Sequence, residues 1–228
     1  MNTQNLIRWA GLPAMAAGII FVAIQPIHPP DFLESVPTET WVIIQSLKTV
    51  MGVFYLFGIV GLYARQSKEA GWLGLAGFLI FSLSWMLQLP FIFTEAFILP
   101  PLAAESPQFV ESFLAIINES ASAVSVGALP TLYGLAGGLY MLGGLLFGIA
   151  TFRAGILPRL AAALLAAAGP LSVILVSLLP HHLERLAALP MGLAMAWLGY
   201  ALLFERRAGA AERPANRGSS QLRPSGAK

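Results

Sequence analysis

Six long apolar stretches constrain this chain more than any other feature of the sequence. A helix needs roughly 20 residues to cross a bilayer core of about 30 Å, and each stretch comes close to that length. The stretches are Trp9–Ile27, Trp41–Tyr63, Gly71 to about Leu89, Pro130–Phe152, Leu160–Leu179 and Leu186–Phe204. We therefore expect an all-α integral membrane protein with six transmembrane helices.

The composition agrees with this expectation and excludes several other classes. Of the 228 residues, 57% are hydrophobic and 11% are charged, whereas soluble domains are usually about 45–50% apolar and about 25% charged. The net charge is +2, and the basic residues fall in short connecting segments and a tail, so we expect a lipid bilayer and no nucleic acid as the partner. The absence of cysteine excludes disulfides and thiolate metal sites.

The distribution of basic residues predicts the orientation in the membrane. If the six stretches alternate in direction, 11 of the 13 Lys and Arg residues lie on one side, and the exceptions are Lys48 within a helix and Arg185 on the other side. The positive-inside rule then places both termini in the cytoplasm. We expect residues 1–207 to form the transmembrane domain and residues 208–228 to form a disordered, basic cytoplasmic tail.

The segment between the third and fourth stretches has a helical pattern of its own. Ser106 followed by Pro107 is typical of a helix start, and the apolar residues after it, from Phe109 to Ile117, recur at helical spacing. This pattern predicts an outer amphipathic segment. It could lie on the membrane interface or pack as a lid on the helix ends, and the sequence favours neither.

Lys48 is the residue that most needs an explanation. It follows Trp41 by seven residues, which puts it roughly 10 Å inside the membrane at 1.5 Å per residue. An unpaired charge at the centre of a span costs about 2.5–3.5 kcal/mol on insertion scales. Gln45 lies one turn away on the same helical face.

The third stretch offers partners for Lys48. Gln88 lies near the same depth, Glu95 shares its helical face, and Pro90 is expected to free the carbonyl of Met86. One hypothesis is an outer cavity that binds a ligand, in which Lys48 and Glu95 attract each other directly or through water. The alternatives are a buried clamp between helices and a lysine that extends to the headgroups. The hypothetical cavity is lined by Gln45, Lys48, Gln88 and Glu95.

Glycines in the fourth stretch predict close helix packing. They occur in two pairs with four-residue spacing, which lets helix backbones approach closely: Gly134 and Gly138, then Gly144 and Gly148. The same spacing could serve the interior of the bundle or a homo-oligomer.

The histidines do not predict a metal or cofactor site. His28, His181 and His182 all lie in predicted outer loops, without the ligand spacing of zinc enzymes. Haem between helices needs histidines within the spans, and the predicted spans contain none. We expect no metal, no cofactor and no catalytic residue.

Three blocks of sequence are distinctive: FTEAFILP (93–100), LFGIATFRAGILPR (146–159) and AWLGY (196–200). Together they resemble a group of small bacterial multi-helix membrane proteins that have no assigned activity. The resemblance covers most of the membrane region but not the tail. It implies a bacterial cytoplasmic membrane, and it transfers no functional residue.

Three functions follow from this reading. The first, which we favour, is a structural, accessory or sensor-type membrane component that acts with a partner protein or as a homo-oligomer, and whose polar residues only stabilise the fold. The second is a small-solute or ion carrier that uses Lys48 and Glu95 as binding charges. The third is a membrane-embedded enzyme that acts on lipid; it is the least favoured, because an acid–base pair needs a geometry that depth alone does not give.

Overall fold

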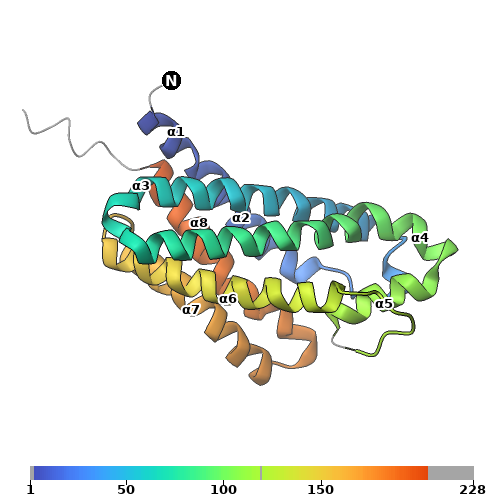
Figure 1. Cartoon of the computed structure of the whole chain (residues 1–228). Coiled ribbons are helices and arrows are strands. Elements are labelled where there is room, and N and C mark those ends of the chain that lie inside the picture. The colour runs from blue at the N-terminus through green and yellow to red at the C-terminus, as the bar shows by residue number, and fades with distance from the viewer. Residues whose placement is uncertain (1–2, 119, 205–228) are drawn as a thin grey trace, which may run out of the picture.

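The computed structural model describes residues 3–118 and 120–204, and most of these residues are helical (Figure 1). That part of the chain contains no strand. The predicted tail lies outside the described residues. The elements in order are α1 (Thr3–Trp9), α2 (Gly11–Ile24), η1 (Gln25–Ile27), η2 (Leu33–Ser35), α3 (Glu39–Phe93), η3 (Thr94–Ile98), α4 (Leu99–Glu105), α5 (Pro107–Ile117), α6 (Leu129–Ala154), α7 (Arg159–Leu178), η4 (His181–Ala188) and α8 (Leu189–Leu203).

Five helical segments within the described residues are long and apolar enough to cross a membrane. They are Thr3–Ile27, Glu39–Glu105, Leu129–Ala154, Arg159–Leu178 and Leu183–Leu203. The predicted class of all-helical, multi-pass membrane protein therefore agrees with the structure. The number differs from the predicted six because the second and third stretches belong to one 67-residue segment.

The joined segment reverses direction at Gly71 rather than at a loop (Figure 1). Gly71 has φ 56° and ψ −157°, a conformation that residues with a Cβ rarely adopt. The sequence predicts a connecting segment over residues 64–70, but those residues stay helical up to the glycine. The reason is local: Ala64, Arg65, Gln66, Lys68 and Glu69 are all good helix formers. We refer to the two halves of α3 as its first and second arms.

Small residues allow the helix backbones to approach closely where α2 crosses α8. A Cβ on Gly18 would overlap the backbone of Gly192 and Ala196, so only glycine permits this approach. The second arm of α3 crosses α6 in the same way, with Gly77 against the backbone of Phe147. Lipid tails are as apolar as the helices, so the hydrophobic effect does not drive the helices together. Close van der Waals contacts of this kind stabilise the bundle instead.

Helix α5 packs as a lid on the helix ends. Its residues Val110, Phe113 and Leu114 are buried in a separate apolar cluster with Trp41 and Leu99. Of the two alternatives for this segment, the structure therefore supports the lid. Pro107 occupies the first turn as predicted, whereas Ser106 makes no side-chain cap hydrogen bond. We call the end of the bundle with α4 and α5 the lid end and the end with Gly71 the turn end (Figure 1).

The first and last described helices meet at the turn end. Arg8 Nε donates a hydrogen bond of 2.8 Å to the carbonyl oxygen of Leu203, at the C-terminus of α8. A cation at this position also interacts favourably with the negative end of the helix dipole. In Figure 1, α1 and the end of α8 lie near the reversal of α3.

Candidate functional site

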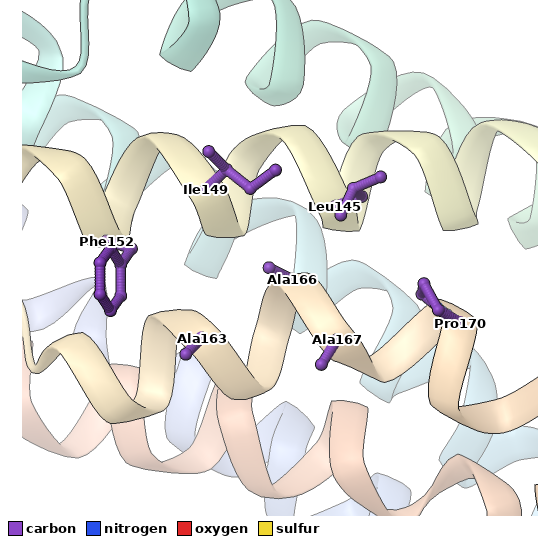
Figure 2. A pocket seen from close by; sticks show the side chains of 7 residues that line it. All are labelled: Leu145, Ile149, Phe152, Ala163, Ala166, Ala167 and Pro170. Carbon is purple, nitrogen blue, oxygen red and sulfur yellow. The ribbon is translucent and has the colours of Figure 1, made fainter.

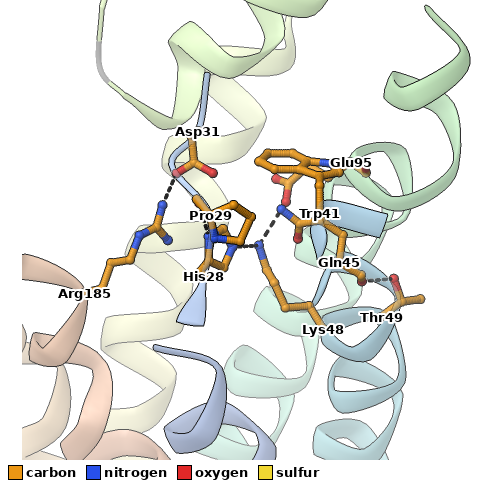
Figure 3. Close-up of polar contacts among 9 residues, drawn as sticks. All are labelled: His28, Pro29, Asp31, Trp41, Gln45, Lys48, Thr49, Glu95 and Arg185. Carbon is orange, nitrogen blue, oxygen red and sulfur yellow. Dashed lines mark hydrogen bonds and ion pairs between the residues drawn. The ribbon is translucent and has the colours of Figure 1, made fainter. Parts of the chain in front are cut away.

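The lid end holds a cluster of polar side chains that the fold brings together from four separate segments (Figure 3). Its centre is an ion pair between Lys48 on the first arm of α3 and Glu95 in η3, with 2.9 Å between Nζ and Oε2. The Glu95 side chain is 4% exposed and that of Lys48 is 18% exposed. Burial of either charge alone would be strongly unfavourable, so the direct pairing stabilises both.

The backbone geometry of η3 explains why Trp41 forms a hydrogen bond with Glu95. Residues 94–98 form a π-helix, in which the amide of Leu99 donates to the carbonyl of Thr94. In the same pattern the amide of residue 100 would donate to the carbonyl of Glu95, but residue 100 is proline and has no N–H. That carbonyl instead accepts a hydrogen bond of 2.8 Å from the Trp41 indole Nε1.

His28 closes the ion pair on its other side. Its Nδ1 lies 2.6 Å from the carbonyl oxygen of Pro29, and its Nε2 lies 3.4 Å from Lys48 Nζ. A carbonyl can only accept, so Nδ1 carries the proton and Nε2 accepts from the ammonium group. Burial, together with the charges of Lys48 and Arg185, lowers the pKa of His28 from 6.5 to about 4. The imidazole is therefore neutral at pH 7.

A second ion pair extends the cluster towards the lid. Arg185 in η4 pairs with Asp31 in the segment after η1, and Asp31 is 7% exposed. The backbone carbonyl of Asp31 accepts a hydrogen bond of 2.8 Å from Asn118 Nδ2, at the end of α5. These contacts tie the segment between η1 and η2 to both η4 and α5. We call the whole set the lid-end cluster: His28, Asp31, Trp41, Lys48, Glu95 and Arg185.

The two glutamines of the sequence hypothesis do not pair with the charges. Gln45 is fully buried one turn from Lys48, yet its side-chain amide has no hydrogen-bond partner among the described residues. Its backbone carbonyl accepts from Thr49 Oγ1 at 3.0 Å. Gln88 is half-buried and makes no side-chain hydrogen bond within the described part of the chain. Of the four predicted residues, Lys48 and Glu95 therefore pair directly, and Gln45 lies alongside them (Figure 3).

The predicted glycine contacts divide into two pairs with different surroundings. A Cβ on Gly148 would overlap the backbone of Ala166 in α7, and one on Gly144 would lie 3.1 Å from Met191 Cε in α8. A Cβ on Gly134 or Gly138 would meet nothing within 4 Å. The structure thus brings only the second pair against neighbouring helices, because Gly134 and Gly138 lie on the exposed face of α6 while Ala136 faces the interior.

Sequence reasoning missed four members of the lid-end cluster. In the sequence, Trp41 marks only the start of the second apolar stretch, and His28 lies in a predicted outer loop, so neither position indicates a partner. Asp31 and Arg185 are 154 positions apart in sequence, so no spacing could pair them. One signal was available: Arg185 is the only basic residue in the predicted outer segments. The side chains of His181 and His182 lie outside what the structure describes.

Comparison with known proteins adds no functional information. No protein-family model, no curated protein and no solved structure matches the chain. The resemblance found in the three sequence blocks therefore stays an expectation, and the chemistry has to be argued from the site itself.

Proposed function

We propose that the chain crosses a bacterial cytoplasmic membrane six times, with both termini in the cytoplasm. A straight 67-residue helix would be about 100 Å long, more than three times the thickness of a bilayer core. The reversal at Gly71 instead supports two antiparallel spans from this segment. The contact between Arg8 and Leu203 supports an even number of spans, and the basic residues near the turn end support its cytoplasmic location.

We propose further that the protein is a structural, accessory or sensor-type membrane component, in which the lid-end cluster is a clamp. The observation that carries this proposal is the Lys48–Glu95 ion pair, which is enclosed by His28 and Trp41. The hydrogen bonds and ion pairs of the cluster join α3, η3, η4, α5 and the segment after η1, which lie at this end of the bundle.

One observation favours a second candidate, a carrier of small solutes or ions. The buried amide of Gln45 has no partner among the described residues and lies one turn from the ion pair. A buried amide without a partner costs about 1–3 kcal/mol, and a polar solute beside Lys48 would remove that cost. The carrier therefore remains the alternative.

The double variant Lys48→Met, Glu95→Gln tests the clamp. Replacing both partners avoids stranding one buried charge, which alone would cost about 3–5 kcal/mol whatever the function. If the cluster is a clamp, the double variant should still lose about 1–3 kcal/mol, because His28 Nε2 loses its donor. The measurement is the thermal midpoint of purified protein, and the exposed pair Lys68→Met, Glu69→Gln is the matched control.

Two outcomes would overturn the clamp. The first is a double variant that is as stable as the wild type or more so. The second is a rise in the thermal midpoint of the wild type with acetate, ammonium or glycine that is absent in the double variant; this result would favour the carrier.

A further inference from the structure

An open, apolar groove runs between α6 and α7 near the turn end, away from the lid-end cluster. It has a volume of about 410 Å³, within the range of about 300–1,000 Å³ that is usual for ligand pockets. Figure 2 shows that Leu145, Ile149 and Phe152 line one side, and that Ala163, Ala166, Ala167 and Pro170 line the other.

The shape of the groove follows from the difference in side-chain size across it. The contact between Gly148 and the backbone of Ala166 holds the two helices close together. Beside that contact, α7 presents alanines against the larger side chains of α6, so the space between the helices stays unfilled. Phe152, Ala167 and Pro170 are exposed, which leaves the groove open along the surface of the bundle.

Positive charge lies at one end of this apolar surface. The guanidinium carbon of Arg159 lies 5.9 Å from the centre of the Phe152 ring, in a cation–π contact at the rim of the groove. Its Nη2 lies over the α6–α7 turn, 3.3 Å from where a Cβ on Gly155 would be. Arg153, in the last turn of α6, is exposed at the same turn.

We propose that this groove binds one anionic phospholipid, with an acyl chain between α6 and α7 and the phosphate group at Arg159 and Arg153. The argument is charge complementarity at the end of an apolar channel. The apolar groove alone would accept an acyl chain of any lipid, whereas the two arginines select a headgroup with net negative charge. Anionic lipids are enriched in the cytoplasmic leaflet, the side at which the proposed topology places this turn. The inference rests on that topology and is independent of the lid-end cluster.

The test compares two lipids that differ only in the headgroup. Dioleoyl phosphatidylglycerol or dioleoyl phosphatidylcholine is added to purified, detergent-solubilised protein, and the thermal midpoint is followed as a function of lipid concentration. We expect a saturable rise with phosphatidylglycerol and little or none with phosphatidylcholine. Arg159→Gln should raise the phosphatidylglycerol concentration for half-maximal effect by about fivefold, the contribution of one basic residue near a membrane surface.

A second variant tests the acyl-chain part of the site. Ala167→Phe fills the groove from an exposed position and should abolish the response without changing the midpoint in detergent alone. The matched controls are Lys68→Gln and Ala64→Phe, which make the same kinds of change at exposed positions on α3 and should keep the wild-type response.

Three results would overturn the proposal. One is an equal response to both lipids, and another is a wild-type response in Arg159→Gln and Ala167→Phe. The third is a dimer of the wild type in native mass spectrometry without lipid that Ala167→Phe converts to a monomer, because the groove would then be an interface between two copies. A failure of the clamp experiment would leave all of these readouts unaffected.

Discussion

His28 determines how the lid-end cluster responds to acid, because it is the member whose ordinary pKa lies closest to neutrality. It faces Lys48 and Arg185, which disfavour its protonation, and Asp31, which favours it. Glu95 lies on the far side of Lys48. A protonated imidazole could no longer accept the hydrogen bond from the Lys48 ammonium group, so acid removes one contact from the cluster.

Stability should therefore fall as the pH is lowered through the range set by His28. Its pKa is about 4 in the folded protein and 6.5 as the reference for the unfolded chain, so protons bind the unfolded state more tightly. The contribution of His28 is complete above pH 6.5 and is lost towards pH 4, with a slope of at most about 1.4 kcal/mol per pH unit. Thermal midpoints measured between pH 7.5 and 4.5 would show this slope.

The variant His28→Gln is the matched control for that experiment. Its side-chain oxygen can accept from Lys48 as Nε2 does, but the amide does not titrate. The variant should be close to the wild type at pH 7.5, should change less with pH, and should therefore be the more stable of the two at pH 4.5. Equal slopes in the two proteins would mean that the acid sensitivity comes from other groups.

Single residues could be predicted from the sequence only where position along one helix constrains them. The distance from Trp41 predicts that Lys48 lies at membrane depth, and the helical face shared with Gln88 indicates Glu95 as a partner. Lys48 and Glu95 form an ion pair, whereas Gln88 makes no side-chain hydrogen bond among the described residues, because equal depth does not fix the direction of a side chain. The hydrogen bond from Trp41 to the carbonyl of Glu95 depends on the π-helix and on Pro100, which the pattern of apolar residues does not reveal.

At the level of helices, α6 offers a direct test of packing, because one of its glycines lies against a neighbouring helix and another lies in open space. Gly148→Ala places a Cβ against the backbone of Ala166, which cannot move without separating α6 from α7. We expect a loss of about 1–3 kcal/mol in the free energy of unfolding. Gly138→Ala meets nothing within 4 Å and should be neutral or stabilising by up to about 1 kcal/mol through helix propensity.

Thermal or denaturant unfolding of the two alanine variants, measured side by side, would check this prediction. A large loss of stability in Gly138→Ala would mean that a second copy or a partner protein covers this face of α6, as the homo-oligomer alternative requires. Equal stability of Gly148→Ala and the wild type would contradict the close α6–α7 contact.

The sequence predicted the helices better than it predicted how they connect. All six apolar stretches are largely helical, because their length and composition leave lipid-embedded backbone no other way to satisfy its hydrogen bonds. The reversal at Gly71 was missed, since nothing in the local pattern separates a one-residue turn from a short loop. The close crossing between α2 and α8 was also missed, because its glycines are spaced by seven residues rather than four: Gly11, Gly18, Gly192 and Gly199.

For the molecule as a whole, the proposed topology predicts which residues face each side of the membrane. The native chain has no cysteine, so single cysteines can be introduced without background labelling. Glu34→Cys and Ser106→Cys, at exposed positions of the lid end, should react with a membrane-impermeant maleimide in intact cells. Lys68→Cys and Arg153→Cys, exposed near the turn end, should react only after the cells are opened. Labelling of Lys68→Cys in intact cells would contradict the six-span arrangement.

The pairing of charges at the lid end also determines how the protein experiences a membrane potential. A single elementary charge that moves across the membrane changes in energy by about 2.3 kcal/mol per 100 mV. Lys48 and Glu95 lie 2.9 Å apart and cancel, Asp31 and Arg185 cancel in the same way, and His28 is neutral. An applied voltage thus exerts no net force on the cluster as a unit, and it acts there only by turning the dipole of a pair or by pulling its partners apart.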